Sequence, residues 1–325
     1  MESIKVSILV VTYNQEAYIA ACLDSLLVQK TSFKYEILVG DDASQDGTAK
    51  IVQRYAEMYP DMIVPVLRKK NIGATNNSYE LWRLARGQYI AFCDGDDCWL
   101  GKNRLQEQTD FLDSHPNFSA VCGRSRLIDE QGNEIPESSL HTKQVFWKFN
   151  RSVYTRDDFS RWRMPCHDSA ILGHNPWNEQ DPSLLYMAHP IVGDRTFVMY
   201  FLLRGDIACQ EEEVSCYRYV LKGEHFMTDY AKENRRYQDF LLMCRLEKYA
   251  NRHRWPLSLL KWKQERLIAA ACVWLKKPNM KNWHVLYSIV KDSGNRRHYV
   301  LWTLKILVRK WWQWHVSGKD IPIRL

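Results

Sequence analysis

Three carboxylates within four positions follow a short apolar segment in the first third of the chain. Residues 89–93 read Tyr-Ile-Ala-Phe-Cys, and Asp94, Asp96 and Asp97 come directly after them. Because closely spaced carboxylates repel one another and resist burial, we expect a divalent cation, Mn²⁺ or Mg²⁺, among them. The apolar segment is typical of a buried strand, and Gly95 allows a sharp turn behind it. The motif predicts a metal site that holds a diphosphate; an acidic loop without a metal is the simpler alternative.

Two further polar clusters follow segments that we expect to be strands. Residues 12–14, Thr-Tyr-Asn, leave the apolar segment 6–11, and Asp42 follows the apolar segment 35–39 closely. In an open α/β sheet, ligands bind at the carboxyl ends of the strands. We therefore expect all three clusters to converge at one edge of a sheet.

The order of the expected elements predicts the fold class. Strand and helix patterns alternate over the first 113 residues, with helices expected near 16–27, 46–58, 79–85 and 104–113. This alternation predicts an α/β fold with a mostly parallel sheet and helices on both faces. The chain has no Gly-x-Gly-x-x-Gly after its first strand and no Gly-Lys-Ser/Thr loop. Dinucleotide and P-loop binding are therefore disfavoured.

Three motifs taken together resemble a known family. They are residues 10–14, Val-Val-Thr-Tyr-Asn, residues 40–48, Gly-Asp-Asp-Ala-Ser-Gln-Asp-Gly-Thr, and residues 94–99, Asp-Gly-Asp-Asp-Cys-Trp. In order and spacing they resemble the family 2 glycosyltransferases over about residues 4–125, and the resemblance resumes near 190–222. It implies a GT-A fold, a nucleotide-diphosphate sugar as donor, and transfer of the sugar to an acceptor hydroxyl with inversion.

The resemblance also implies roles for single residues on the donor side. Asp94 and Asp96 match the family's Asp-x-Asp motif, which touches the ribose and holds the metal-bound diphosphate. Asp42 would accept a hydrogen bond from the nucleobase. The nucleotide-binding role is expected for Thr12, Tyr13, Asn14, Asp42 and Asp94, and the metal-binding role for Asp96 and Asp94.

On the acceptor side the resemblance implies that Asp194 is the catalytic base. Asp194 precedes a helix expected at 195–203, so a role as the N-cap of that helix is the alternative. Asp168 is the next candidate for the base. Contacts with the acceptor or the diphosphate are expected from Asp97, Trp99, His167, Asp168, Arg218 and His225.

The charge of the chain is distributed unevenly. The net charge is +7, but residues 231–325 hold 21 Lys and Arg residues against 6 Asp and Glu, together with eight of the thirteen Trp. Such a segment indicates a polyanionic partner. A helix expected at 297–316 combines basic residues with Trp, as in helices that lie in a membrane interface, so we expect an anionic membrane surface as partner. Packing against neighbouring helices is the alternative, and no nucleic-acid-binding module is recognisable.

These patterns predict two domains, a GT-A nucleotide-sugar-binding and catalytic domain at 1–230 and a helical extension at 231–325. The nine cysteines include no Cys-x-x-Cys pair, which favours reduced thiols. The apolar segment near the N-terminus is too short for a signal peptide, and no apolar run approaches the roughly 20 residues that span a bilayer. We therefore expect a cytoplasmic protein, peripheral on the inner face of the plasma membrane.

The expected function is transfer of a sugar, with a UDP-sugar as donor and a saccharide or lipid-linked acceptor, in surface polysaccharide or glycolipid assembly. One alternative is a nucleotide-sugar-binding protein without catalytic activity. Another is a haloacid-dehalogenase-type phosphatase, which also places Asp-x-Asp after a strand. The phosphatase is disfavoured because no Thr or Val-Leu follows Asp96 and because it leaves the turn at 12–14 unexplained.

Overall fold

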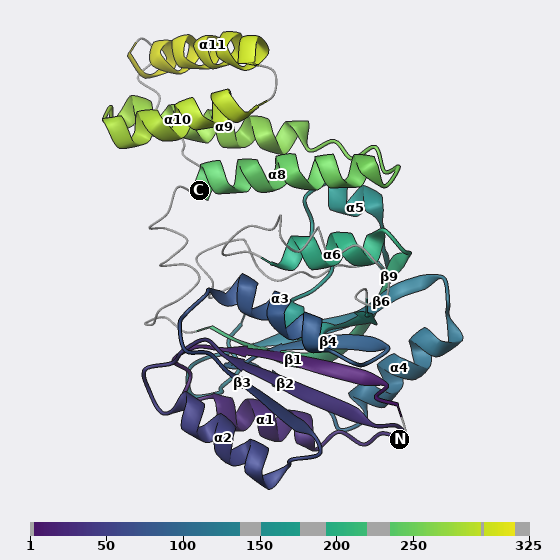
Figure 1. Cartoon of the computed structure of the whole chain (residues 1–325). Coiled ribbons are helices and arrows are strands. Elements are labelled where there is room, and N and C mark those ends of the chain that lie inside the picture. The colour runs from purple at the N-terminus through teal and green to yellow at the C-terminus, as the bar shows by residue number, and fades with distance from the viewer. Residues whose placement is uncertain (1–2, 137–150, 176–192, 220–234, 294–295, 316–325) are drawn as a thin grey trace. The chain divides into compact units, whose positions relative to one another are not determined.

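The computed structural model describes residues 3–136, 151–175, 193–219, 235–293 and 296–315 (Figure 1). The chain divides into two compact units, Met1–Gly223 and Glu224–Leu325. The expected boundary at residue 230 lies outside the described residues. Each unit is described by itself below.

A nine-stranded sheet, counted over the described residues, forms the framework of the first unit, with strand order β3-β2-β1-β4-β8-β6-β9-β5 and β7 paired to β9. The first four strands pair in parallel, whereas β8 pairs antiparallel with both β4 and β6. The sheet is therefore parallel on the β3–β4 side and mixed beyond it. The strands are β1 (Val6–Thr12), β2 (Tyr35–Asp41), β3 (Ile63–Leu67), β4 (Tyr89–Asp94), β5 (Cys98–Trp99), β6 (Phe118–Ile128), β7 (Val153–Tyr154), β8 (Ile171–His174) and β9 (Asp206–Arg218).

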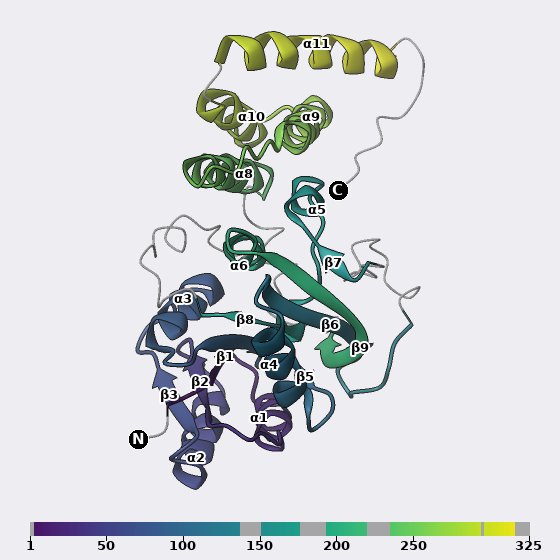
Figure 2. The same cartoon turned by 90° about the vertical axis from the view of Figure 1, so that its right-hand side faces the viewer.

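Helices cover both faces of this sheet, as expected. One face packs against α1 (Ile19–Leu27), α2 (Thr48–Met58) and α4 (Arg104–Ser114), and α3 (Ala74–Leu84) and α6 (Asp194–Leu202) lie on the other face (Figures 1 and 2). Successive residues of a strand point to opposite faces, and both sides of β1 are apolar. Each face of β1 is therefore buried. A short helix α5 (Arg156–Ser160) and a 3₁₀ turn η2 (Asp168–Ala170) complete the unit.

The second unit is helical in its described part. It consists of α8 (Arg235–Arg252), α9 (Leu260–Lys276), α10 (Met280–Asp292) and α11 (Arg296–His315). Its core is a cluster of buried side chains, Phe240, Leu267, Ala270, Ala271, Leu286, Ile289 and Tyr299. Within the described ranges, no helix combines the length and apolar character needed to cross a membrane. The expected helical extension is confirmed.

Candidate active site

The ends of β1, β2 and β4 meet at one edge of the sheet. In the strand register Thr12 lies beside Asp41, and Val11 lies beside Asp94. The backbone N–H of Asp42 donates a hydrogen bond to the carbonyl of Thr12 (3.0 Å). The expected convergence of the three polar clusters is therefore confirmed.

Gly95 allows the acidic turn after β4 to lie directly against the end of β1. Its N–H donates to the carbonyl of Val11 at 2.9 Å, and the N–H of Asp97 closes the turn on the carbonyl of Asp94 at 2.9 Å. A Cβ at position 95 would lie 2.5 Å from Oε1 of Gln15 and 2.8 Å from Cβ of Thr12. Only glycine fits this turn without a displacement.

The turn after β1 is fastened to the turn after β2. The backbone N–H of Asn14 donates to Oγ of Ser44 (2.9 Å), and Oδ1 of Asn14 accepts from the N–H of Gln45 (2.8 Å). Asn14 has φ of 52°, the left-handed conformation that Asn tolerates better than most residues. Thr12 is only 3% exposed, and its Oγ1 has no hydrogen-bond partner among the described residues. This position suits a ligand that supplies the missing partner.

Asp42 organises a third loop at the same edge. Its two carboxylate oxygens accept hydrogen bonds from the backbone N–H groups of Ile72 and Gly73, each at 2.8 Å. Each oxygen keeps a second lone pair, so a further hydrogen bond from a nucleobase is compatible with this arrangement. That bond stays a prediction.

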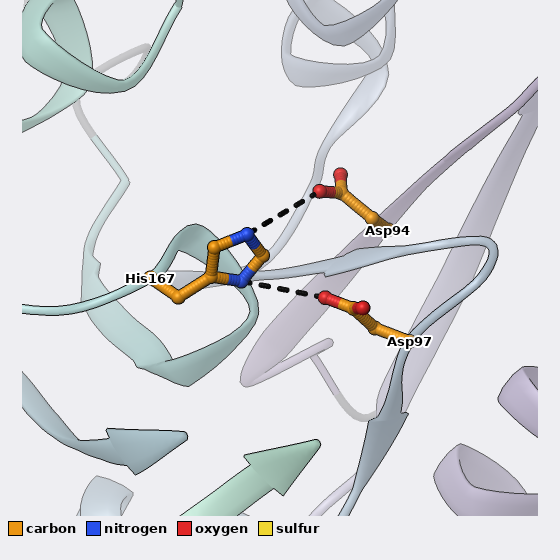
Figure 3. Close-up of side chains that lie close together, drawn as sticks. All are labelled: Asp94, Asp97 and His167. Atoms are coloured by element: carbon orange, nitrogen blue, oxygen red, sulfur yellow. Dashed lines mark ion pairs between the residues drawn. The ribbon is translucent and has the colours of Figure 1, made fainter. Parts of the chain in front are cut away.

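Asp94, Asp97 and His167 form a group that can hold a metal ion, since one ligand atom from each lies within 4.8 Å of the others. Figure 3 shows one ring nitrogen of His167 directed toward each of the two carboxylates. Nδ1 of His167 is 3.3 Å from Oδ2 of Asp97, and Nε2 is 3.9 Å from Oδ2 of Asp94. The group includes Asp94, as expected, but Asp96 is not part of it. The role of Asp96 as a ligand stays a prediction.

The protonation of these residues fits a divalent cation. Burial lowers the pKa of His167 to about 3, so the imidazole is neutral, which is the form that binds metals. Burial and the charges of Asp96 and Asp194 raise the pKa of Asp94 to about 8. Burial and the neighbouring carboxylates also raise the pKa of Asp97. A cation would relieve this repulsion, so the donor set fits Mn²⁺ or Mg²⁺.

Asp97 is also the anchor of the acidic turn. Its Oδ2 accepts a hydrogen bond from Oγ of Ser169 at 2.5 Å, and its Oδ1 accepts from the backbone N–H of Arg218 at 3.0 Å. The hydroxyl of Ser169 also accepts a hydrogen bond from the N–H of Asp94 (3.1 Å). The hydroxyl of Ser169 therefore joins the backbone of Asp94 to the carboxylate of Asp97. Its role was not predicted from the sequence. Its position directly after His167 and Asp168 was the available signal.

Arg218 holds the turn from the other side. Its Nε donates to the carbonyl of Asp96 (2.8 Å), and its Nη1 donates to the carbonyls of Asp129 (2.8 Å) and Glu130 (3.2 Å). The guanidinium also lies over the ring of Tyr18, 4.7 Å from its centroid. Arg218 is thus mainly a cross-link of the backbone, and its expected contact with diphosphate or acceptor stays a prediction.

Asp168 and Asp194 bring a second pair of carboxyl groups to the site. Their side chains are hydrogen-bonded to each other, and burial raises the pKa of both. The charge of Asp194 also raises the pKa of Asp94, so the pair lies near the metal-binding group. The residue at the N-cap of α6 is Gly193, and Asp194 is the first helical residue. The alternative in which Asp194 serves as the N-cap is therefore wrong.

Three further residues, Trp99, Tyr13 and His225, were expected to contact a ligand. Trp99 is 4% exposed, its ring lies under the guanidinium of Arg104, 3.9 Å from the centroid, and its Nε1 donates to the carbonyl of Phe92. Such a position in the core does not support a contact with the acceptor. Tyr13 is half-buried in the turn after β1, and its expected contact with the nucleotide stays a prediction. His225 lies outside the described residues.

A buried arginine that the sequence analysis did not identify supports the turn that carries His167. Nη1 of Arg104 donates to the carbonyl of Ser169 (2.8 Å) and to that of Val214 (3.0 Å). Arg104 therefore joins η2 to β9 behind the site. Its buried position could not be predicted from the sequence, because a single Arg in an amphipathic helix normally faces solvent.

The chain is similar to the crystal structure of residues 1–349 of Staphylococcus aureus TarS in complex with UDP-GlcNAc, with a TM-score of 0.54 and 19% identity over 91% of this chain and 90% of that one. This likeness shows the GT-A fold. The model of Glycosyl transferase family 2 matches residues 7–173. The chain belongs to this family.

Three curated relatives show how far the similarity extends. An uncharacterized protein of Mycobacterium tuberculosis is 41% identical over 131 residues, 40% of this chain and 38% of that protein. The putative glycosyltransferase EpsE of Bacillus subtilis is 36% identical over 43% of this chain and 52% of its own length. The poly(ribitol-phosphate) β-N-acetylglucosaminyltransferase TarS of S. aureus is 35% identical over 74% of this chain and 39% of its own length. The chain thus spans about half or less of these relatives.

Proposed function

We propose that this protein is a metal-dependent, inverting glycosyltransferase that moves a sugar from a nucleotide-diphosphate sugar to an acceptor hydroxyl. The observation that carries the proposal is the position of two groups of different chemistry at one site. A donor set for a cation, Asp94, Asp97 and His167, lies beside a pair of carboxyl groups, Asp168 and Asp194. The first suits a diphosphate, and the second suits a hydroxyl that must lose a proton.

The proposed donor is a UDP-sugar. The similar TarS structure contains UDP-GlcNAc, and the family membership supports a nucleotide-sugar at the same strand ends. In this proposal Thr12, Tyr13 and Asn14 surround the base, with the unpaired Oγ1 of Thr12 available for a hydrogen bond. Asp42 accepts a second hydrogen bond from the base and so discriminates among nucleobases.

Asp94, Asp97 and His167 would hold the divalent cation, and Asp96 remains a candidate ligand from the same turn. A cation there supplies positive charge at the diphosphate, where negative charge develops as the sugar leaves. The protein's own contribution is orientation. Ser169 and Arg218 fix the carboxylate of Asp97, so the donor set is formed before the ligand arrives.

Asp194 would act as the general base. Its carboxylate removes the proton of the acceptor hydroxyl as that oxygen bonds to the anomeric carbon, while the bond from this carbon to the diphosphate oxygen breaks. The raised pKa of Asp194 makes it a better proton acceptor than an ordinary carboxylate. The single displacement inverts the anomeric centre.

We further propose a saccharide or lipid-linked acceptor, in the assembly of surface polysaccharide or glycolipid. The name of TarS, a poly(ribitol-phosphate) β-N-acetylglucosaminyltransferase, supports transfer to a polymeric acceptor, and the name of EpsE, a putative glycosyltransferase, supports sugar transfer alone. A cytoplasmic location is also proposed, and the nine free thiols are consistent with a reducing compartment.

The test is release of UDP from UDP-sugars in the presence of Mn²⁺, with and without candidate saccharide acceptors. We expect release to rise with acceptor and to require Asp194, with the Asp194→Asn variant as the matched control. Binding of the UDP-sugar without any acceptor-dependent release across the acceptor panel would identify a nucleotide-sugar-binding protein instead. Release of inorganic phosphate would identify a phosphatase.

A further inference from the structure

Helix α11 of the second unit has two apolar faces. Tyr299 is buried in the core cluster of that unit, and Trp302, Ile306 and Leu307 pack against it. Helix α11 contacts both α9 and α10. A helix that needed only to complete the bundle would carry polar residues on its other side.

The other side of α11 is apolar as well. We call it the exposed face, and it comprises Leu301, Leu304, Val308, Trp311 and Trp312, each between 51% and 67% exposed. With about 100° of rotation per residue, these positions share one side of the helix, opposite the residues that pack inward. Scattered exposed apolar residues are ordinary, but a continuous row of this kind marks an interaction surface.

The charge on this face identifies the kind of partner. Leu301, Leu304, Val308 and Trp312 line a shallow groove together with Lys305 and Arg309. The sequence of α11 contains five Lys and Arg residues and no Asp or Glu. A second copy of the chain docked here would bring like charges together, which disfavours a dimer through this face. An anionic partner with an apolar interior satisfies both the charge and the apolar row.

We propose that the exposed face of α11 docks on the surface of an anionic phospholipid membrane. Leu301, Leu304 and Val308 would enter the boundary between headgroups and acyl chains, and Trp311 and Trp312 would lie at headgroup depth. Lys305 and Arg309 would contact lipid phosphates. This geometry is that of a helix lying in the interface, and it goes beyond the proposed sugar transfer without depending on it.

The test uses the full chain and vesicles of phosphatidylcholine, with or without phosphatidylglycerol. We expect co-sedimentation with the anionic vesicles only, weakening as salt is added. Lipid brominated near the headgroup end of its acyl chains should quench part of the Trp fluorescence of the bound protein, since Trp311 and Trp312 would lie at headgroup depth.

Two double variants separate the apolar and the charge contributions. Leu304→Gln with Val308→Gln should lower the partition coefficient at least about tenfold, because both side chains lose their transfer into the interface. Met280→Gln with Tyr287→Gln on α10 is the matched control, since both residues are exposed and apolar.

Lys305→Gln with Arg309→Gln should lower partitioning about 30-fold, which corresponds to about 1 kcal/mol for each charge. Lys277→Gln with Lys281→Gln should have a smaller effect.

Several outcomes would overturn the proposal. One is that wild type stays in the supernatant with anionic vesicles at low salt, and another is that the α11 variants bind like wild type. A dimer in light scattering that the apolar variant dissociates, without vesicle binding by wild type, would identify a second copy as partner. Binding that appears only after removal of residues 316–325 would mean that this segment covers the face. Circular dichroism verifies that each variant is folded. UDP binding reports on the candidate active site alone, so a failure of membrane docking can be distinguished from a failure of the proposed sugar transfer.

Discussion

The carboxyl groups of Asp168 and Asp194 are hydrogen-bonded to each other, although they belong to η2 and α6. Two ionised carboxylates contain no donor, so this bond requires one shared proton. Burial and the charge of Asp194 raise the pKa of Asp168 well above its ordinary value. Asp168 is therefore the donor and Asp194 the acceptor of this bond, and burial raises the pKa of Asp194 as well.

Substitution of Asp194 by Asn should stop sugar transfer and leave the fold intact. The amide cannot accept a proton from the acceptor hydroxyl, so we expect transfer to fall by at least about 10²-fold. Because Gly193 is the N-cap and the amide oxygen of Asn can still accept the hydrogen bond from Asp168, the main loss is a favourable charge in the first turn of α6, worth about 0.3–1 kcal/mol. Steady-state transfer, UDP affinity and thermal melting measure the three effects. Transfer at close to the wild-type rate would assign the base to another residue.

Asp168 should act by orienting Asp194, and two substitutions distinguish this from a structural role. Asp168→Asn keeps an N–H donor for Asp194, whereas Asp168→Ala removes it. Since a hydrogen bond to a charged group is worth about 1.5–3 kcal/mol, kcat should fall roughly 10- to 100-fold in the Ala variant and less in the Asn variant. The KM for the donor should change little. Equal kcat in the two variants would exclude the orienting hydrogen bond.

Ser169→Ala should weaken both stability and metal binding. The substitution leaves Oδ2 of the buried Asp97 without its donor and the N–H of Asp94 without an acceptor, at about 1–3 kcal/mol for each group. Ser125→Ala is the matched control, because it removes a hydrogen bond to Ser215 on the same sheet (2.8 Å). We expect only Ser169→Ala to lower Mn²⁺-dependent UDP affinity. Chemical denaturation and calorimetry provide the measurements, and equal UDP affinities in the two variants would contradict the positioning role.

Binding of UDP should depend on the metal and on the residues that hold it. EDTA should lower the affinity for UDP in wild type, because the diphosphate charge then faces Asp94 and Asp96 without compensation. His167→Ala should lower Mn²⁺-dependent affinity at least about tenfold if the imidazole is a ligand. Asp96→Ala tests the ligand expected from the Asp-x-Asp motif in the same titration. If UDP binds equally well in all these conditions, the acidic turn is not a metal site.

Gly95→Ala should displace the acidic turn. The added Cβ would lie 2.5 Å from Oε1 of Gln15 and 2.8 Å from Cβ of Thr12, so the turn and the end of β1 must separate. We expect a loss of about 1–3 kcal/mol of stability together with weaker UDP binding. Gly101→Ala is the control, since Gly101 has φ of 75° but no atom within 4 Å of an added Cβ. It should cost stability through backbone strain alone and leave UDP affinity unchanged.

The donor side of the site was predictable because it depends on local patterns. Val6–Thr12 and Tyr89–Asp94 are strands whose apolar residues indicate burial, and parallel strands place their carboxyl ends together. Thr12, Asp42 and Asp94 could therefore be assigned to one edge from sequence alone. No long-range contact had to be known.

The segment 167–169 was less predictable because its place in the site depends on pairings between distant segments. Ser169 reaches Asp97 across 72 positions in sequence, and this contact exists only because β8 enters the sheet antiparallel to β4. Nothing in residues 171–174 indicates that direction. The extent of β9 is likewise not evident from the sequence, since the strand runs from Asp206 to Arg218. Its exposed segment Glu211–Glu213 interrupts the apolar alternation that identifies a strand.

The three-residue segment His167–Ser169 belongs to both halves of the site at once. His167 belongs to the group that can hold a cation, and Ser169 holds the acidic turn. Asp168, between them, is hydrogen-bonded to Asp194. Donor and acceptor should therefore bind with positive thermodynamic coupling, since a ligand that holds His167 in its bound position also holds Asp168, and the reverse. Such coupling is reciprocal, so a saccharide acceptor should tighten UDP binding by the same factor by which UDP tightens acceptor binding.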